Sequence, residues 1–202
     1  GRDSLNEVVR AAEATGLELV VIADNYDRAG DDLRDRTREV VAVNLQAPLM
    51  VVPGIEASIR DVAGTIGLPP ETARLVPVVY VHLSGRTRGI AIDPPASKAR
   101  YLANLFHALL NVATIPAVTA LARPFNIGQF PTPLSPSQLP RSALDELASA
   151  MNDHDVAFEI SARMHWWFPE LSVEEFTNEY AQVIAAFAAR NVKFLVSSEA
   201  RS

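Results

Sequence analysis

Short apolar runs alternate with amphipathic stretches along the whole chain. Continuous runs of Val, Ile, Leu and Ala are typical of strands buried on both faces of a parallel sheet. We expect strands at six places, residues 17–23, 49–52, 76–83, 115–122, 156–160 and 192–196. Strands that alternate with helices form right-handed β-α units. The pattern therefore predicts an α/β fold, with a parallel barrel as the first choice and an open sheet as the alternative.

The predicted helices between these runs have recognisable starts. Ser4 with Glu7, and Ser172 with Glu175, match the capping box, in which each side chain bonds a free backbone amide of the first helical turn. Helices are expected over residues 4–14, 97–112, 141–151 and 172–189. The Asp- and Arg-rich residues 27–38 have alternating charges at helical spacing and lead into an apolar stretch, which predicts a further helix with a solvated outer face.

Two segments are not expected to be regular. Four prolines lie between residues 126 and 140, so this segment is predicted to be a loop over the strand ends. Trp166 and Trp167 stand beside Pro169 and are expected to close the mouth of the barrel, while stacking on a base or sugar stays open as the alternative. His107 lies in a predicted helix and is expected to be a surface or packing residue.

Each predicted strand leads to a polar tip. The carboxyl ends of parallel strands meet at one edge, where α/β proteins keep their functional groups. Residues 51–58 read as a strand that stops at the turn Pro53-Gly54 and presents Glu56 just beyond its end. The tips on the other strands are Asp24-Asn25, His82, Arg123, Ser161-Ala162-Arg163 after the strand that carries Glu159, and Ser198-Glu199. The sequence therefore predicts a site in which carboxylates, an imidazole and guanidinium groups meet.

Composition narrows the class of protein. The 202 residues with 49% hydrophobic side chains predict one domain over residues 1–202, and a net charge of −6 argues against a broad nucleic-acid or membrane surface. The chain has no cysteine, so thiolate metal sites and disulfides are excluded, and a cytoplasmic location is expected. Neither a Gly-rich phosphate loop nor a serine in a nucleophile elbow is present.

Taken in order, the tips resemble the motifs of the polymerase and histidinol phosphatase (PHP) family. The family pattern is His-x-His, Thr-Asp-His, Pro-Gly-x-Glu, a Val-His-Leu-like segment, His-Pro and Ser-Asp-Ala-His. This sequence has no His-x-His, and its corresponding segments are Ala23-Asp24-Asn25, residues 53–56, Val81-His82-Leu83, Arg123-Pro124 and residues 198–201. The resemblance implies a distorted, TIM-like seven-stranded barrel with a trinuclear metal site, and it places the missing first-strand pair upstream of residue 1.

The departures from the family pattern imply a degenerate metal site. The resemblance carries a metal-ligand role to Glu56 and His82, and to Glu199 as a longer carboxylate in place of Asp. Asn25, Arg123 and Arg201 stand where the family has histidines, and a guanidinium cannot be a ligand. We expect Arg123 and Arg201 to replace the charge of the metal beside Glu56, Glu199 and the pocket residue Asp24.

The sequence leaves two functions open. The favoured one is a PHP-like domain that is catalytically silent or weakly active and binds a small anion such as phosphate, or a partner, at the strand ends. The alternative is a metal-dependent phosphoesterase, a phosphatase or phosphodiesterase that uses Zn, Mn or Mg to activate water. The expected cofactor is accordingly a divalent metal at reduced occupancy, or none. Substrate, biological partner and oligomeric state are not predicted.

Overall fold

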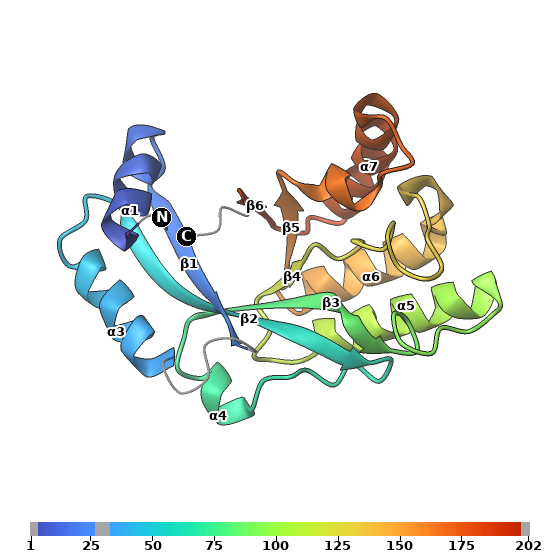
Figure 1. Cartoon of the computed structure of the whole chain (residues 1–202), viewed down its shortest axis with the longest axis horizontal. Helices are drawn as coiled ribbons and strands as arrows, with labels where there is room; N and C mark the ends of the chain where they lie inside the picture. The colour runs from blue at the N-terminus through green and yellow to red at the C-terminus, as the bar shows by residue number, and fades with distance from the viewer. Residues whose placement is uncertain (1–3, 27–32, 199–202) are drawn as a thin grey trace.

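A curled, six-stranded parallel sheet forms the centre of the computed structural model, which describes residues 4–26 and 33–198 (Figure 1). The strand order follows the chain, β1-β2-β3-β4-β5-β6, and every neighbouring pair is parallel. The strands are β1 Leu19–Asn25, β2 Met50–Asp61, β3 Val78–Arg88, β4 Ala120–Ala122, β5 Ala157–Ser161 and β6 Phe194–Ser197. The arrangement is a half-barrel of the kind that the alternating sequence pattern predicted.

Helices connect successive strands. The α-helices are α1 Leu5–Ala14, α3 Leu33–Asn44, α4 Pro70–Ala73, α5 Lys98–Ala113, α6 Arg141–Asp153 and α7 Val173–Ala188, and the 3-10 helices are η2 Pro136–Gln138 and η3 Met164–Trp167. Both predicted capping boxes are formed, by Ser4 with Glu7 and by Ser172 with Glu175. The helix predicted from the charge-rich segment begins at Leu33 in the described chain, and residues 27–32 lie outside the described residues.

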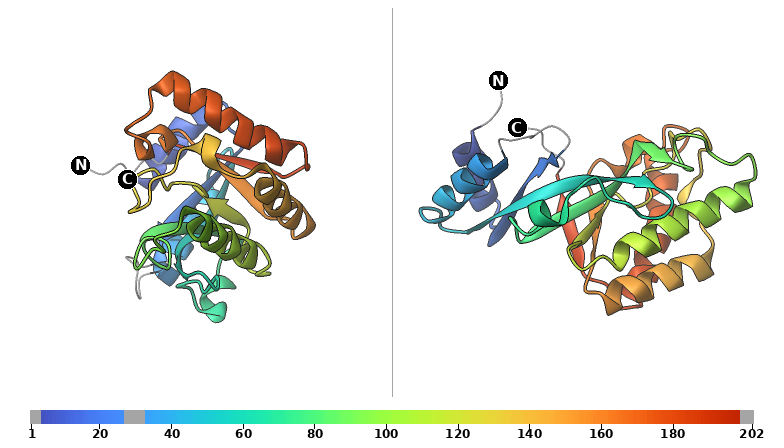
Figure 2. Two further views of the ribbon diagram at one scale, coloured as in Figure 1. Left: turned by 90° about the vertical axis from the view of Figure 1, so that its right-hand side faces the viewer. Right: turned by 90° about the horizontal axis from the view of Figure 1, so that it is seen from below.

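Two apolar clusters hold the helices on the sheet. The main core joins β2–β5 to α5, α6 and α7, and its centre is a group of buried rings in which the centroids of Phe158 and Phe187 are 4.6 Å apart. A smaller cluster of Val9, Val40 and Val51 packs α1 and α3 against β1 and the start of β2. Figure 2 shows α1 and α3 together at one end of the sheet and α5 to α7 at the other.

The strand predicted to stop at Pro53-Gly54 instead continues through both residues to Asp61, so that prediction was wrong. Pro53 and Gly54 pair in register with Ile22 and Ala23 of β1. A Cβ at Gly54 would lie 3.0 Å from Val21 Cγ1, so glycine here permits close approach of two strands and does not mark a turn. Glu56 and His82 are consequently strand residues, and neither lies beyond a strand end.

Candidate functional site

The strand register gathers polar side chains on the inner face of the sheet. Asn25, Glu56 and Tyr80 are register partners across β1, β2 and β3. Ser58 and His82 form the next row, together with Ala122 of β4. Side chains two residues apart in a strand share a face, so Glu56 and Ser58 both project toward the inside of the curled sheet. The inner face of the barrel is therefore polar at the point where the sequence predicted a site.

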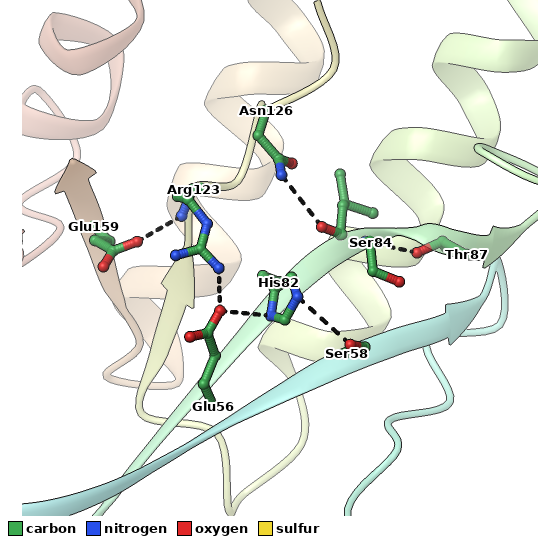
Figure 3. A network of polar contacts seen from close by, with 9 residues as sticks. Glu56, Ser58, His82, Ser84, Thr87, Arg123, Asn126 and Glu159 are labelled. Carbon is green, nitrogen blue, oxygen red and sulfur yellow. Dashed lines mark hydrogen bonds and ion pairs between the residues drawn. The ribbon is translucent and has the colours of Figure 1, made fainter. Parts of the chain in front are cut away.

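Arg123 joins three strands at this point (Figure 3). Its guanidinium Nη2 bonds Oε1 of Glu56 on β2, and its backbone N–H donates to Oε2 of Glu159 on β5 at 2.8 Å. The side chains of Arg123 and Glu56 are 14% and 22% exposed, so the pair is largely removed from water. Arg123 follows β4 directly and has a left-handed backbone with φ 45°, a conformation uncommon for a residue other than glycine. Its contacts hold that backbone in place.

His82 shares the same carboxylate oxygen. Its Nδ1 lies 3.0 Å from Glu56 Oε1, and its side chain is 11% exposed. The two atoms are close enough for an ion pair, but they do not have the geometry of a hydrogen bond. On the other side of the ring, Nε2 lies 3.5 Å from the hydroxyl of Ser58. The imidazole is thus held between a carboxylate and a hydroxyl.

A second carboxylate lies close by. Glu159 is 5% exposed, and this burial raises the pKa of its carboxyl, although the positive charge of Arg123 opposes the shift. Burial also raises the pKa of Tyr80 to about 12, with the charges of Glu159 and Glu56 adding to the effect. The phenol of Tyr80 therefore stays protonated at neutral pH and can act only as a neutral hydrogen-bonding group there.

The remaining predicted site residues do not join this cluster. Asp24 pairs in register with buried Ile55 and lies on the other face of β1 from Asn25, with a 3.3 Å ion pair to Arg36. The expectation that Asp24 lies in the pocket was therefore wrong, because successive side chains along a strand point to opposite faces of the sheet. Burial raises the pKa of Asp24, and the charge of Arg36 opposes this. Glu199 and Arg201 lie outside the described residues.

The residues of the cluster do not fit the metal site that the resemblance implies. Among residues 4–26 and 33–198, no three His, Asp or Glu side chains are grouped so as to hold a metal. Glu56 presents to Arg123 the same oxygen that it presents to His82, and a guanidinium can donate hydrogen bonds but cannot ligate. The donor set is therefore one carboxylate and one imidazole, with a cation already beside them.

Two further residues belong to the cluster and were not selected from the sequence. Glu159 was noted only as part of a predicted strand, and its contact with Arg123 depends on how β4 and β5 pair. Ser58 could have been found from its spacing, since it lies two residues after Glu56 in the same strand. The two-residue spacing of Glu56 and Ser58 was not recognised because the strand was expected to end at Gly54.

The two tryptophans divide between core and surface. Trp167 packs on the main core, whereas Trp166 is 58% exposed and lies under the guanidinium of Arg163, 4.8 Å from the ring centre. The expectation that both would close the barrel mouth was therefore wrong for Trp166. A cation–π contact of this kind on an exposed ring adds about 0.5–1 kcal/mol. His107 is exposed on α5, as expected for a surface residue.

The fold and the cluster around Glu56 define the chain as an α/β protein with a curled parallel half-barrel and a polar inner face. Solved structures with this fold include the histidinol phosphate phosphatase of Lactococcus lactis, complexed with zinc, L-histidinol and phosphate. The match has a TM-score of 0.63 at 13% identity and covers 97% of this chain and 79% of that one. The fold is thus like that of PHP-type histidinol phosphatases.

Two other structures share the fold. A protein assigned as the histidinol phosphatase of Listeria monocytogenes matches with a TM-score of 0.59 at 12% identity, over 98% of this chain and 89% of that one. A chain of an archaeal ribonuclease P solved with mature tRNA matches with a TM-score of 0.58 at 13% identity. The match covers 100% of this chain and 73% of that one. No protein-family model matches the sequence, and no curated protein is similar to it. Within the described residues, every helix is too short or too polar to cross a membrane.

Proposed function

We propose that the chain is a PHP-like domain in which a salt-bridge cluster has replaced the metal site. In this proposal the domain is silent or weakly active as a metal-dependent hydrolase, and it binds a small anion such as phosphate, or a partner, at the carboxyl ends of its strands. The observation that supports it is the contact of Arg123 with Glu56. A carboxylate that would bridge metals is here neutralised by a permanent cation.

The charges of the cluster set the strength of anion binding. Glu56 occupies the guanidinium of Arg123, so an anion must compete with that carboxylate. Phosphate matches the fork of a guanidinium, and Arg is the side chain best suited to bind it bidentately. Binding is therefore expected to be weak in the native protein and to become stronger when the charge of Glu56 is removed.

We infer that the six strands correspond to six of the seven strands of a PHP barrel. Two of the similar folds belong to proteins named as histidinol phosphatases. The competing function is therefore a metal-dependent phosphoesterase. That function would need Glu56 and His82 to bind Zn, Mn or Mg, and Arg123 to leave Glu56. The third similar fold comes from a ribonuclease P structure, so the scaffold is not confined to histidinol phosphatases.

Metal content and turnover distinguish the two functions. We expect the purified protein to hold well under one equivalent of Zn or Mn, and added metal to leave p-nitrophenyl phosphate hydrolysis at the buffer rate. Metal-dependent turnover that Glu56→Gln abolishes would contradict the proposal and establish the phosphoesterase.

Anion binding is tested separately by titrating inorganic phosphate and following backbone amide shifts. Arg123→Met is expected to remove binding, and Glu56→Gln to tighten it several-fold by removing a carboxylate that competes with the anion for the guanidinium. Arg141→Met is the matched control, because Arg141 is 60% exposed and forms an ion pair with Asp145 on its own helix. Equal phosphate affinity in wild type and Arg123→Met would refute the assignment of Arg123 as the anion-binding group.

A further inference from the structure

Three side chains of the cluster are arranged in a line from hydroxyl to imidazole to carboxylate (Figure 3). Ser58 Oγ lies 3.5 Å from His82 Nε2, and His82 Nδ1 lies 3.0 Å from Glu56 Oε1. The order of groups is that of a serine nucleophile, a general base and an orienting carboxylate. Such sets are recognised by geometry and roles, and they occur on unrelated folds.

The protonation of His82 follows from its neighbours. We assign the proton of the neutral imidazole to Nδ1, because this nitrogen lies 3.0 Å from the ionised carboxylate of Glu56, which accepts hydrogen bonds only, although the two atoms are not aligned as a hydrogen bond. Nε2 then presents its lone pair to the hydroxyl of Ser58. This is the tautomer that a general base needs. The separation of 3.5 Å is long for a hydrogen bond, as is common before substrate aligns such groups.

We propose that Ser58, His82 and Glu56 form a metal-independent acyl-transfer site that acts on small esters. This goes beyond the proposed function and does not depend on it, because neither anion binding nor loss of metal is required for the two contacts that join these side chains. The backbone supplies the spacing: Glu56 and Ser58 are two residues apart on one face of β2, and His82 is the register partner of Ser58 on β3. The geometry is therefore built into adjacent strands and not into a loop.

The reaction balances without a cofactor. Ser58 Oγ attacks the ester carbonyl carbon while its proton moves to His82 Nε2, and the tetrahedral intermediate collapses as that proton passes to the leaving alkoxide. Water then attacks the acyl-serine with His82 again as the base, releasing the carboxylic acid and restoring Ser58. Glu56 acts as a positioning residue, because it touches the imidazole and not the reacting atoms. Arg123 bonds the same oxygen of Glu56, Oε1, that faces the imidazole.

Burial limits the size of the substrate. Ser58 is 4% exposed, and the third residue of its row is Ala122, whose methyl side chain takes little space on the inner face. A short acyl group is therefore expected to react, and a longer one to be excluded. Acetyl esters should be turned over faster than butyryl esters by about tenfold or more, because the burial of Ser58 leaves less room for a longer acyl group.

The test uses the full chain with p-nitrophenyl acetate, and diisopropyl fluorophosphate as a covalent probe. We expect turnover above the buffer rate and a single phosphoryl adduct on the peptide that carries Ser58, mapped by mass spectrometry. Ser58→Ala and His82→Ala should each lower turnover by about 100-fold or to background. Ser142→Ala and His154→Ala are matched controls on the exposed surface of the protein. Glu56→Gln should lower kcat with little change in KM, and Glu56→Asp should recover part of the loss.

Several outcomes would overturn the proposal. Turnover that survives in Ser58→Ala, an adduct on any residue other than Ser58, or no adduct in the native protein would each do so. The mapping is made on the native chain, so it decides the matter even where a variant fails to fold. A metal chelator separates this activity from the competing phosphoesterase, because ester turnover should persist in its presence. Phosphate binding can fail while the adduct forms, and the reverse, so the two proposals are tested independently.

Discussion

Replacing Arg123 by Met should destabilise the protein by about 2–3 kcal/mol. Met keeps the apolar stem of the side chain but removes the cation beside Glu56. Breaking a fully buried pair costs about 3–5 kcal/mol, and an exposed pair contributes up to about 1 kcal/mol. The two side chains here are 14% and 22% exposed, which places the effect between these limits. The bond from the backbone N–H of Arg123 to Glu159 does not depend on the side chain and should remain.

Urea unfolding followed by circular dichroism measures this change. For a chain of this length, about 2–3 kcal/mol corresponds to a fall in melting temperature of about 4–12 °C. A double-mutant cycle with Glu56→Gln isolates the pair, and we expect a coupling free energy of about 2 kcal/mol. Arg141→Met breaks an exposed pair and should change stability by less than about 0.5 kcal/mol. Additive effects of Arg123→Met and Glu56→Gln would show that the pair contributes nothing to stability.

Two further predictions concern burial and close packing. Burial raises the pKa of the Glu159 carboxyl above its ordinary value of 4.5, so the native state binds this proton more tightly than the unfolded state does. The native protein therefore loses stability as the pH rises from 4.5 through the raised pKa. The stability of Glu159→Gln relative to wild type should therefore increase with pH in urea unfolding between pH 4 and 8, and a pH-independent difference would refute this. A Cβ at Gly128 would lie 2.2 Å from the backbone oxygen of Trp167, so Gly128→Ala should destabilise the protein by at least about 2 kcal/mol. A Cβ at Gly85 would meet no atom within 4 Å, so Gly85→Ala should change the stability by less than about 1 kcal/mol. Equal effects of the two glycine substitutions would contradict the packing around Gly128.

Helix starts and the order of elements could be predicted because their signals are local. The pair of Ser172 with Glu175 encodes its capping box within four residues, and the structure forms it. Strand limits were less predictable: Pro53-Gly54 is a common turn signal, yet here the two residues lie inside β2. What decides between turn and strand is the neighbouring strand, since β1 packs so closely on Gly54 that a Cβ there would lie only 3.0 Å from Val21 Cγ1.

The site was predictable in part for the same reason. From the sequence we expected Glu56, His82 and Arg123 to meet at the carboxyl ends of parallel strands. They do meet, although Glu56 and His82 lie within β2 and β3. The sequence could not place Glu159 beside Arg123, since that contact joins two strands 36 residues apart and depends on the left-handed backbone of Arg123. Asp24 was misplaced because the face to which a polar residue at a strand end projects depends on the register of the strand. A shift of one residue moves the side chain to the opposite face.

One carboxylate oxygen links the proposals made for this protein. Oε1 of Glu56 faces both the guanidinium of Arg123 and the imidazole of His82, so the two side chains compete for it. An anion that draws Arg123 away would leave Glu56 to His82 alone and would strengthen the orientation of the ring toward Ser58. Phosphate binding and ester turnover should therefore be coupled through Glu56, and by thermodynamic reciprocity a substrate that orders His82 would loosen Arg123 for the anion. The coupling should vanish in Glu56→Gln, because the shared charge is then absent while both partners remain.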